Sequence, residues 1–282
     1  MYLQHFGLAE RPFGLTPDTA FAFSTRAHQE ALNTLLVAAD AGEGFIKITG
    51  EVGTGKTLLC RRFLATLPTS CLSCYLPNPS HTPRTLLLAL AEELGETVPA
   101  TCDEFSLQKR IEQTLLSRAA EDRRVVVCID EAQSLKHASL ETLRLLSNLE
   151  TEKRKLMQVV LFGQPELDAR LARPDLRQLR QRISFHYRLG TLSRDELRAY
   201  LDHRLRVAHY RGPELFSRGA GAALHRASGG TPRLVNILAH KALLAVYGEG
   251  TMHVERRHVR QAVRDNADAP APRFGWARWL LR

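Results

Sequence analysis

The stretch Gly50-Glu51-Val52-Gly53-Thr54-Gly55-Lys56-Thr57 matches the pattern G-x-x-x-x-G-K-[ST] at every fixed position. Residues 45–49 before it predict a strand, and the apolar spacing of Leu59, Phe63 and Leu67 after it predicts a helix. In this strand–loop–helix context the pattern forms a phosphate-binding loop. Glycines let backbone N–H groups close around phosphates, and the following helix N-terminus favours anions.

A second pattern contains Asp130, 74 positions after Lys56. Residues 125–129 are an unbroken apolar run, typical of a strand buried on both faces, and Asp130-Glu131 follows directly. A carboxylate at the end of such a strand can hold Mg²⁺, so we assign Asp130 and the Thr57 hydroxyl as metal ligands. Lys56 is expected to contact the β- and γ-phosphates, and Glu131 to act as general base. The two patterns together imply ATP and Mg²⁺ as cofactors, and hydrolysis of ATP to ADP and phosphate.

The organisation of the chain favours an α/β domain followed by helices. Five short apolar runs between residues 45 and 189 alternate with helical patterns, which predicts a parallel sheet covered by helices on both faces. Strand signals end there, and Ser193-Arg194-Asp195-Glu196 is a capping box that opens the first of four predicted helices. We therefore predict an α/β nucleotide-binding domain over residues 1–190, a helical lid domain over 191–268 and a flexible tail over 269–282. The second of the lid helices is expected to begin at Pro213.

The two motifs, with Asp130-Glu131-Ala132-Gln133, resemble the AAA+ ATPases of the ExeA/GspA type. The opening residues 2–13, residues 28–32 and the segment Leu161-Phe162-Gly163-Gln164-Pro165-Glu166-Leu167 are also similar to that family, so the resemblance covers residues 1 to about 265. It implies a P-loop NTPase (AAA+) fold, a homo-oligomer, and membrane-associated pilus or secretion assembly proteins as partners. The secretion members carry a membrane span and a periplasmic domain after the ATPase part. Their absence from this sequence leads us to expect the shorter pilus type.

Three further site residues follow from the resemblance. Gln164 matches the sensor-1 position, although many AAA+ proteins have Asn or Thr there; a residue that caps its own helix is the alternative. Arg182 is our choice for an arginine finger acting in a neighbour's site, with Arg177 and Arg180 as alternatives to it, and a solvated arginine surface as the alternative for all three. Arg233 matches sensor 2.

Elementary electrostatics supports the assignment of Arg233. Thr231 is a suitable N-cap and Pro232 suits the first helical position, which puts Arg233 in the first turn. The helix dipole disfavours a cation there by roughly 0.3–1 kcal/mol. An arginine in that turn is better explained by a facing anion such as ATP than by a surface site. Phe6, Pro12, Phe13 and Leu15 are expected either to line the adenine pocket or to pack in a core.

The charge of the chain is placed unevenly. Residues 191–282 hold 16 Lys/Arg against 8 Asp/Glu, most of the net charge of +9. This basic C-terminal third suits nucleic acid, an acidic surface or a merely solvated arginine-rich face. One alternative to the assembly ATPase is therefore a DNA-binding AAA+ regulator of the transposition type. The other alternative, which does not depend on this charge, is an ATP-gated scaffold with little turnover.

The sequence also bears on location. It contains neither a stretch of roughly 18 uncharged apolar residues nor a signal peptide pattern. We therefore expect a cytoplasmic protein without a transmembrane segment, located in the cytoplasm or at the periphery of the inner membrane.

Overall fold

The computed structural model describes residues 2–16, 18–77, 82–99, 101–150 and 155–266. The chain forms two compact units. Unit 1 comprises Met1–Thr25, Val52–Thr54 and Thr191–Arg282, and unit 2 comprises Arg26–Glu51 and Gly55–Gly190. The predicted tail 269–282 lies outside the described residues.

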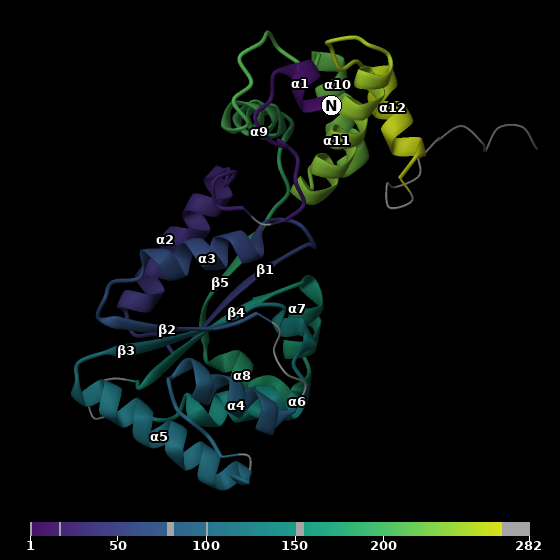
Figure 1. Cartoon of the computed structure of the whole chain (residues 1–282). Coiled ribbons are helices and arrows are strands. Elements are labelled where there is room, and N and C mark those ends of the chain that lie inside the picture. Colours follow the sequence, from purple (N-terminus) through teal and green to yellow (C-terminus); the bar gives the residue numbers. More distant parts are fainter. Residues whose placement is uncertain (1, 17, 78–81, 100, 151–154, 267–282) are drawn as a thin grey trace, which may run out of the picture. The chain divides into compact units, whose positions relative to one another are not determined.

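Unit 2 is built on a five-stranded parallel sheet with the order β2-β3-β4-β1-β5 (Figure 1). Its strands are β1 (Phe45–Gly50), β2 (Cys71–Leu76), β3 (Arg124–Ile129), β4 (Met157–Gly163) and β5 (Ile183–Leu189). Its helices are α2 (Arg26–Asp40), α3 (Lys56–Thr66), α4 (Pro83–Glu93), α5 (Glu104–Ala120), α6 (His137–Leu146), α7 (Pro165–Leu171) and α8 (Arg177–Gln181), with short 3₁₀ turns at η1 (Ala132–Ser134) and η2 (Pro174–Leu176). The α/β fold with a parallel sheet is confirmed.

The period-two alternation of the strands divides their side chains between two cores. On β3, Val125, Val127 and Ile129 pack in one core with residues of α4 to α8. Val126 and Cys128, from the same strand, pack in the other with residues of α2 and α3. An all-apolar strand is required here because both faces of a parallel sheet are covered. Burial on both faces holds the ends of β1 and β3, and so the loops that follow them, in fixed positions.

Unit 1 is helical. It contains α1 (Tyr2–Phe6), α9 (Arg194–Val207), α10 (Arg218–Ser228), α11 (Pro232–Gly248) and α12 (Arg256–Arg264). The predicted capping box is present at the start of α9: Ser193 accepts from the Glu196 backbone N–H, and Glu196 accepts from that of Ser193. Within the described residues, no helix of the chain is long and apolar enough to cross a membrane.

Two boundaries differ from the prediction. Residues 1–25 belong to the helical unit, although the predicted α/β domain began at residue 1. Phe6 and Phe13 are 3% exposed in the core of unit 1, so core packing is the role that the structure gives them. Helix α10 begins at Arg218 and not at Pro213, because Phe216 bridges to Val254 and Ser217 caps the helix.

Candidate functional site

The predicted phosphate loop lies between the end of β1 and the start of α3. Gly53 and Gly55 have φ angles of +80° and +96°, a region that residues with a Cβ rarely adopt. A Cβ on Gly55 would also lie 2.9 Å from Nε2 of His28. Gly55 is the N-cap of α3 and offers no side-chain cap, so the first N–H groups of this helix are left to a ligand. The loop therefore has the backbone that an anion requires.

Lys56 is buried at 5% exposure inside this loop. Its Nζ donates to the carbonyl oxygens of Gly50 and Glu51, at 2.8 and 2.9 Å. Burial lowers the pKa of the ammonium, and the nearby carboxylates of Glu131 and Asp130 oppose that shift. A buried ammonium held by carbonyl oxygens is a favourable partner for an incoming phosphate.

The two predicted metal ligands meet. The Thr57 hydroxyl, from the first turn of α3, donates to Oδ2 of Asp130 at 2.6 Å. Asp130 follows β3 directly and is 3% exposed. A hydroxyl and a carboxylate are hard oxygen donors of the kind Mg²⁺ prefers, and Mg²⁺ takes one or two such protein groups together with phosphate oxygens. The residues present thus fit the ion.

Glu131 lies beside this pair in an unusual backbone conformation. Its φ is 51°, although it is not glycine. Its backbone N–H donates to Oδ1 of Asp130 at 2.9 Å, and its carbonyl accepts from the N–H and the hydroxyl of Ser134. The turn after β3 therefore fixes the backbone position from which the Glu131 side chain extends.

Gln164 comes from the end of the neighbouring strand β4. It is the N-cap residue of α7, yet its side chain makes no cap hydrogen bond and its Nε2 donates to Oε2 of Glu131 at 3.1 Å. The structure thus brings Lys56, Thr57, Asp130, Glu131 and Gln164 together at the carboxyl ends of three adjacent strands, β3, β4 and β1. That edge is where ligands bind in open parallel sheets.

Comparison with known proteins agrees with this geometry. Residues 39–171 match the family model described as an AAA domain. In solved structures, the chain is similar to Cdc6p of Pyrobaculum aerophilum, with a TM-score of 0.69 and 18% identity over 88% of this chain and 70% of that one. It is also similar to the Aeropyrum pernix ORC2 protein in its ADPNP-ADP complexes, with a TM-score of 0.64 and 17% identity over 91% and 73%. The fold is that of an α/β P-loop NTPase.

A curated relative refines this assignment. The chain is 45% identical over 251 residues to General secretion pathway protein A of Aeromonas hydrophila. The match covers 89% of the chain and 46% of the relative, so the chain spans less than half of that protein's length. The chain is thus similar to this protein over part of that protein's length, and residues 39–171 match an AAA domain.

The arginines before β5 differ in what they contact. Arg182 is half-buried and its Nη1 donates to the Ser147 hydroxyl at 3.2 Å and to the Arg144 carbonyl at 3.4 Å, at the C-terminal end of α6. Arg177 and Arg180 are exposed on α8 and make no hydrogen bond or ion pair with the described part of the chain. Of the three candidate fingers, Arg182 is thus hydrogen-bonded to α6, whereas Arg177 and Arg180 have no such bond to a described residue.

Arg233 lies in the first turn of α11, as predicted. Thr231 is the N-cap residue without a side-chain cap bond, and Pro232 is at the first helical position. Within unit 1, which includes Val52–Thr54, the Arg233 backbone N–H donates to the Gly53 carbonyl at 3.3 Å. Its exposed guanidinium forms no ion pair among the residues that the structure describes.

One residue of this site was not assigned a role from the sequence. The side-chain amide of Gln133 donates to Glu131 and accepts from the backbone N–H of Gln164. Gln133 stands in the quoted Asp130-Glu131-Ala132-Gln133 motif, and a polar amide so close to a general base was the available signal. Its partner Gln164, directly after β4, is 31 positions away, and only the fold brings the two together.

Proposed function

We propose that the protein binds ATP with Mg²⁺ and hydrolyses it to ADP and phosphate. The observation that carries this proposal is the contact of Thr57 with Asp130 at 2.6 Å, beside the buried Lys56 and next to Glu131. If the loop pattern were a chance match, there would be no reason for Asp130, 73 positions after Thr57, to lie against it as a second oxygen ligand. The AAA+ fold and the relation to General secretion pathway protein A support the same activity.

Each residue has a role in this proposal. The backbone of residues 50–57 surrounds the phosphates, and Lys56 contacts the β- and γ-phosphates. Thr57 and Asp130 hold Mg²⁺, which neutralises charge on the phosphate oxygens when bound. Glu131 accepts the proton of the attacking water, Gln164 orients that water or the γ-phosphate, and Arg233 pairs with phosphate charge.

The active form is proposed to be a homo-oligomer in which an arginine finger reaches a neighbour's site. Arg182 was chosen from the sequence, but it must first release Ser147 and the Arg144 carbonyl. Arg180 is exposed and, within the described residues, has no bond to release. The same holds for Arg177. We propose Arg182 as the finger, with Arg180 and Arg177 as the alternatives to it.

The activity is tested by phosphate release at saturating ATP and Mg²⁺ from the wild type, Lys56→Ala and Glu131→Gln. Glu131→Gln should still bind nucleotide, but its turnover should be at least about 100-fold slower than that of the wild type, because a general base contributes roughly 10²–10⁴-fold. Lys56→Ala should lose both binding and turnover. The matched control is Lys109→Ala, which removes an exposed lysine of α5. Equal rates in all four proteins would end the proposal.

The setting of the reaction is proposed from the relative. Its name, General secretion pathway protein A, supports partners in a membrane-associated type II secretion assembly. Within that group we propose the MSHA-like pilus type, similar to the pilus biogenesis ATPase MshM, with a cytoplasmic location at the inner membrane periphery. The partner is identified by copurification with the Glu131→Gln variant in the presence of ATP. Recovery of pilus proteins would support the pilus type, whereas recovery of secretion proteins alone would assign the protein to secretion instead.

The two alternatives gain no support from the comparisons. Likeness to proteins that bind or process DNA, such as the Aeropyrum pernix ORC1 protein in complex with DNA and the Thermotoga maritima RuvB motor, stands at 20% and 15% identity. Similarity at that level concerns the fold alone. Nucleic-acid binding and a scaffold without turnover therefore stay as predictions from the sequence.

A further inference from the structure

Gln133 connects two parts of the site that come from different strands. It lies in η1, the turn after β3, and its side-chain Nε2 donates to Oε2 of Glu131 at 2.5 Å. The other end of the same amide, Oε1, accepts the backbone N–H of Gln164 at 3.0 Å. Both hydrogen-bonding ends of the Gln133 side chain are thus used, one on each side of the site.

The neighbouring residues leave room for this bridge. A Cβ on Gly163, the last residue of β4, would lie 3.4 Å from Oε1 of Gln133 and 2.7 Å from Cδ2 of Leu167. A side chain at Gly163 would therefore clash with Leu167, and its Cβ would be in van der Waals contact with the Gln133 amide. Gln133 itself is half-buried, so its hydrogen bonds are partly protected from competition by water.

The bridge leaves the Glu131 carboxylate asymmetric. Oε2 accepts from two amides, those of Gln133 and Gln164. Oε1 accepts no hydrogen bond from the part of the chain that the structure describes. Two donors on one oxygen restrict the rotation of the carboxylate and leave the other oxygen available to accept a proton from water. When the water oxygen attacks the γ-phosphorus, its proton can pass to Oε1 and ADP leaves with the bridging oxygen.

We propose that Gln133 is a positioning residue for hydrolysis, which holds the Glu131 carboxylate and ties it to the Gln164 segment. The inference rests on the proposed ATPase function and names a residue beyond the predicted set. Glu131 has a left-handed backbone conformation that is unfavourable for its residue type, so it needs bonds of this kind to stay in one place. Without Gln133 the Glu131 carboxylate can still accept a proton, but its orientation is less restricted.

The test is the Gln133→Met variant, which preserves side-chain length and removes both hydrogen bonds. We expect kcat for ATP hydrolysis to fall about 10- to 100-fold, because misplacing a catalytic group by about 1 Å can cost that much. The Kd for ATP, measured with a fluorescent analogue, should stay within about twofold, because no group on the phosphates is removed. On a Glu131→Gln background, Gln133→Met should cause no further loss of rate, because the two residues act as a unit.

The matched control is Gln108→Met. Gln108 is also half-buried, and its Nε2 donates to Oε1 of Glu112 at 3.2 Å on α5. This variant loses the same type of bond away from the site and should keep wild-type kcat. If Gln133→Met does not fold, as judged by thermal unfolding, Gln133→Asn replaces it, since the shorter amide cannot span both partners.

The outcomes separate this inference from the proposed function. If the wild type hydrolyses ATP and Gln133→Met matches it in kcat, or if kcat and affinity fall by the same factor, only the role of Gln133 is overturned. A rate loss that multiplies on the Glu131→Gln background also overturns it. If the wild type releases no phosphate, the proposed function fails and this inference fails with it.

Discussion

Arg204 is a buried cation in the helical unit and has no carboxylate among its described partners. It is 8% exposed, and its guanidinium donates to the Pro12 carbonyl and, at 3.1 Å, to the Tyr200 hydroxyl. The guanidinium also lies over the Phe21 ring, 4.8 Å from its centroid. A buried arginine is tolerated only when its N–H groups are satisfied, and here the N-terminal segment provides part of that satisfaction.

Replacing Arg204 by Met should therefore weaken the attachment of the N-terminal segment. We expect the free energy of unfolding to fall by about 1–3 kcal/mol, because the Pro12 carbonyl loses a buried donor. Arg206→Met, two residues further along α9 and on its exposed side, should change the free energy of unfolding by less than about 0.5 kcal/mol. Urea unfolding of both variants provides the measurement. Equal losses would show that the Pro12 contact has no special weight.

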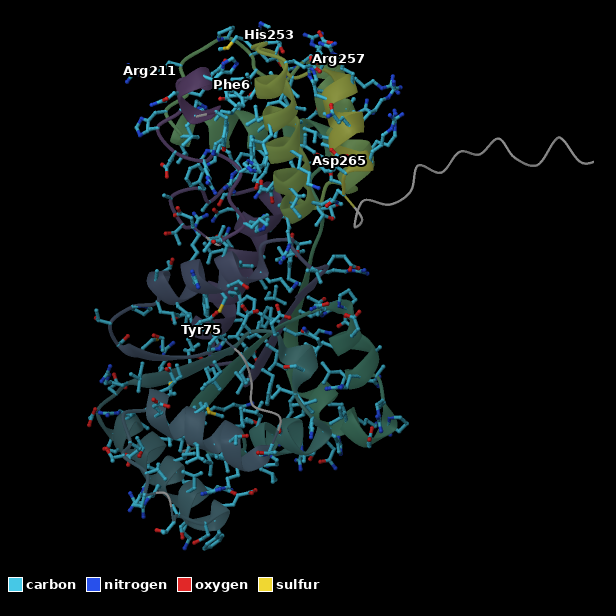
Figure 2. All side chains as sticks on the ribbon, turned by 45° about the vertical axis from the view of Figure 1, so that its right-hand side comes forward. Phe6, Tyr75, Arg211, His253, Arg257 and Asp265 are labelled. Atoms are coloured by element: carbon cyan, nitrogen blue, oxygen red, sulfur yellow. The ribbon has the colours of Figure 1, made fainter. Side chains whose placement is uncertain are left out.

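Helix α12 concentrates positive charge on one face. Its buried side presents His258, Val259 and Ala262. Arg256, Arg260 and Arg264 are exposed at i, i+4 and i+8, and so lie in one row along the opposite side. They form no ion pair with any described residue, and nitrogen-tipped side chains project from this face between Arg257 and Asp265 (Figure 2). On α12, the unpaired positive charge of the basic C-terminal third therefore lies in this row, as far as the described residues show.

The row should govern binding to polyanions in general. We expect the triple variant Arg256→Gln, Arg260→Gln, Arg264→Gln to elute from heparin at clearly lower salt than the wild type, because fewer counterions are released on binding. The control removes three exposed arginines that are paired with carboxylates: Arg26→Gln, Arg173→Gln and Arg198→Gln. It changes net charge equally and should shift elution less. The same shift for both would mean that only net charge matters.

Over the length of the chain, its first residues pack against helices that come some 200 positions later. The Tyr2 and His240 rings lie 5.5 Å apart between centroids, those of His5 and Tyr247 5.4 Å, and those of Phe23 and His203 5.4 Å. Burial lowers the pKa of His203 and of His240, with Arg206 adding to the shift for the first and Arg11 for the second. Both imidazoles are thus held more neutral in the folded chain than in the unfolded one.

This arrangement predicts a loss of stability in mild acid. A lowered folded pKa means that the contribution of each histidine is complete above the unfolded value of 6.5 and is lost as pH falls through the folded value. The melting temperature should drop as the pH falls below about 6.5. Replacing both His203 and His240 by Gln should flatten that drop, and thermal unfolding against pH measures it. A drop that is unchanged in the double variant would place its origin in other groups.

Local patterns were sufficient for the phosphate loop, the strand before Asp130-Glu131 and the capping box of α9. Each depends on residues within one strand, one turn or one helix end, so the chemistry of neighbouring residues specifies it. The five strands and their parallel arrangement followed from alternation with helices. The meeting of Thr57 with Asp130 was expected because the two motifs assign both residues to one Mg²⁺.

Other features depended on contacts between distant residues. The order β2-β3-β4-β1-β5, the docking of residues 1–25 on the helical unit, the later start of α10 and the Gln133 bridge each join segments that local propensity does not connect. A residue such as Phe13 is equally apolar in a nucleotide pocket and in a core, and only the packed neighbours distinguish the two. Sequence pattern thus specifies which side of an element is buried, whereas three-dimensional packing selects the partner, because hydrophobic burial is non-directional.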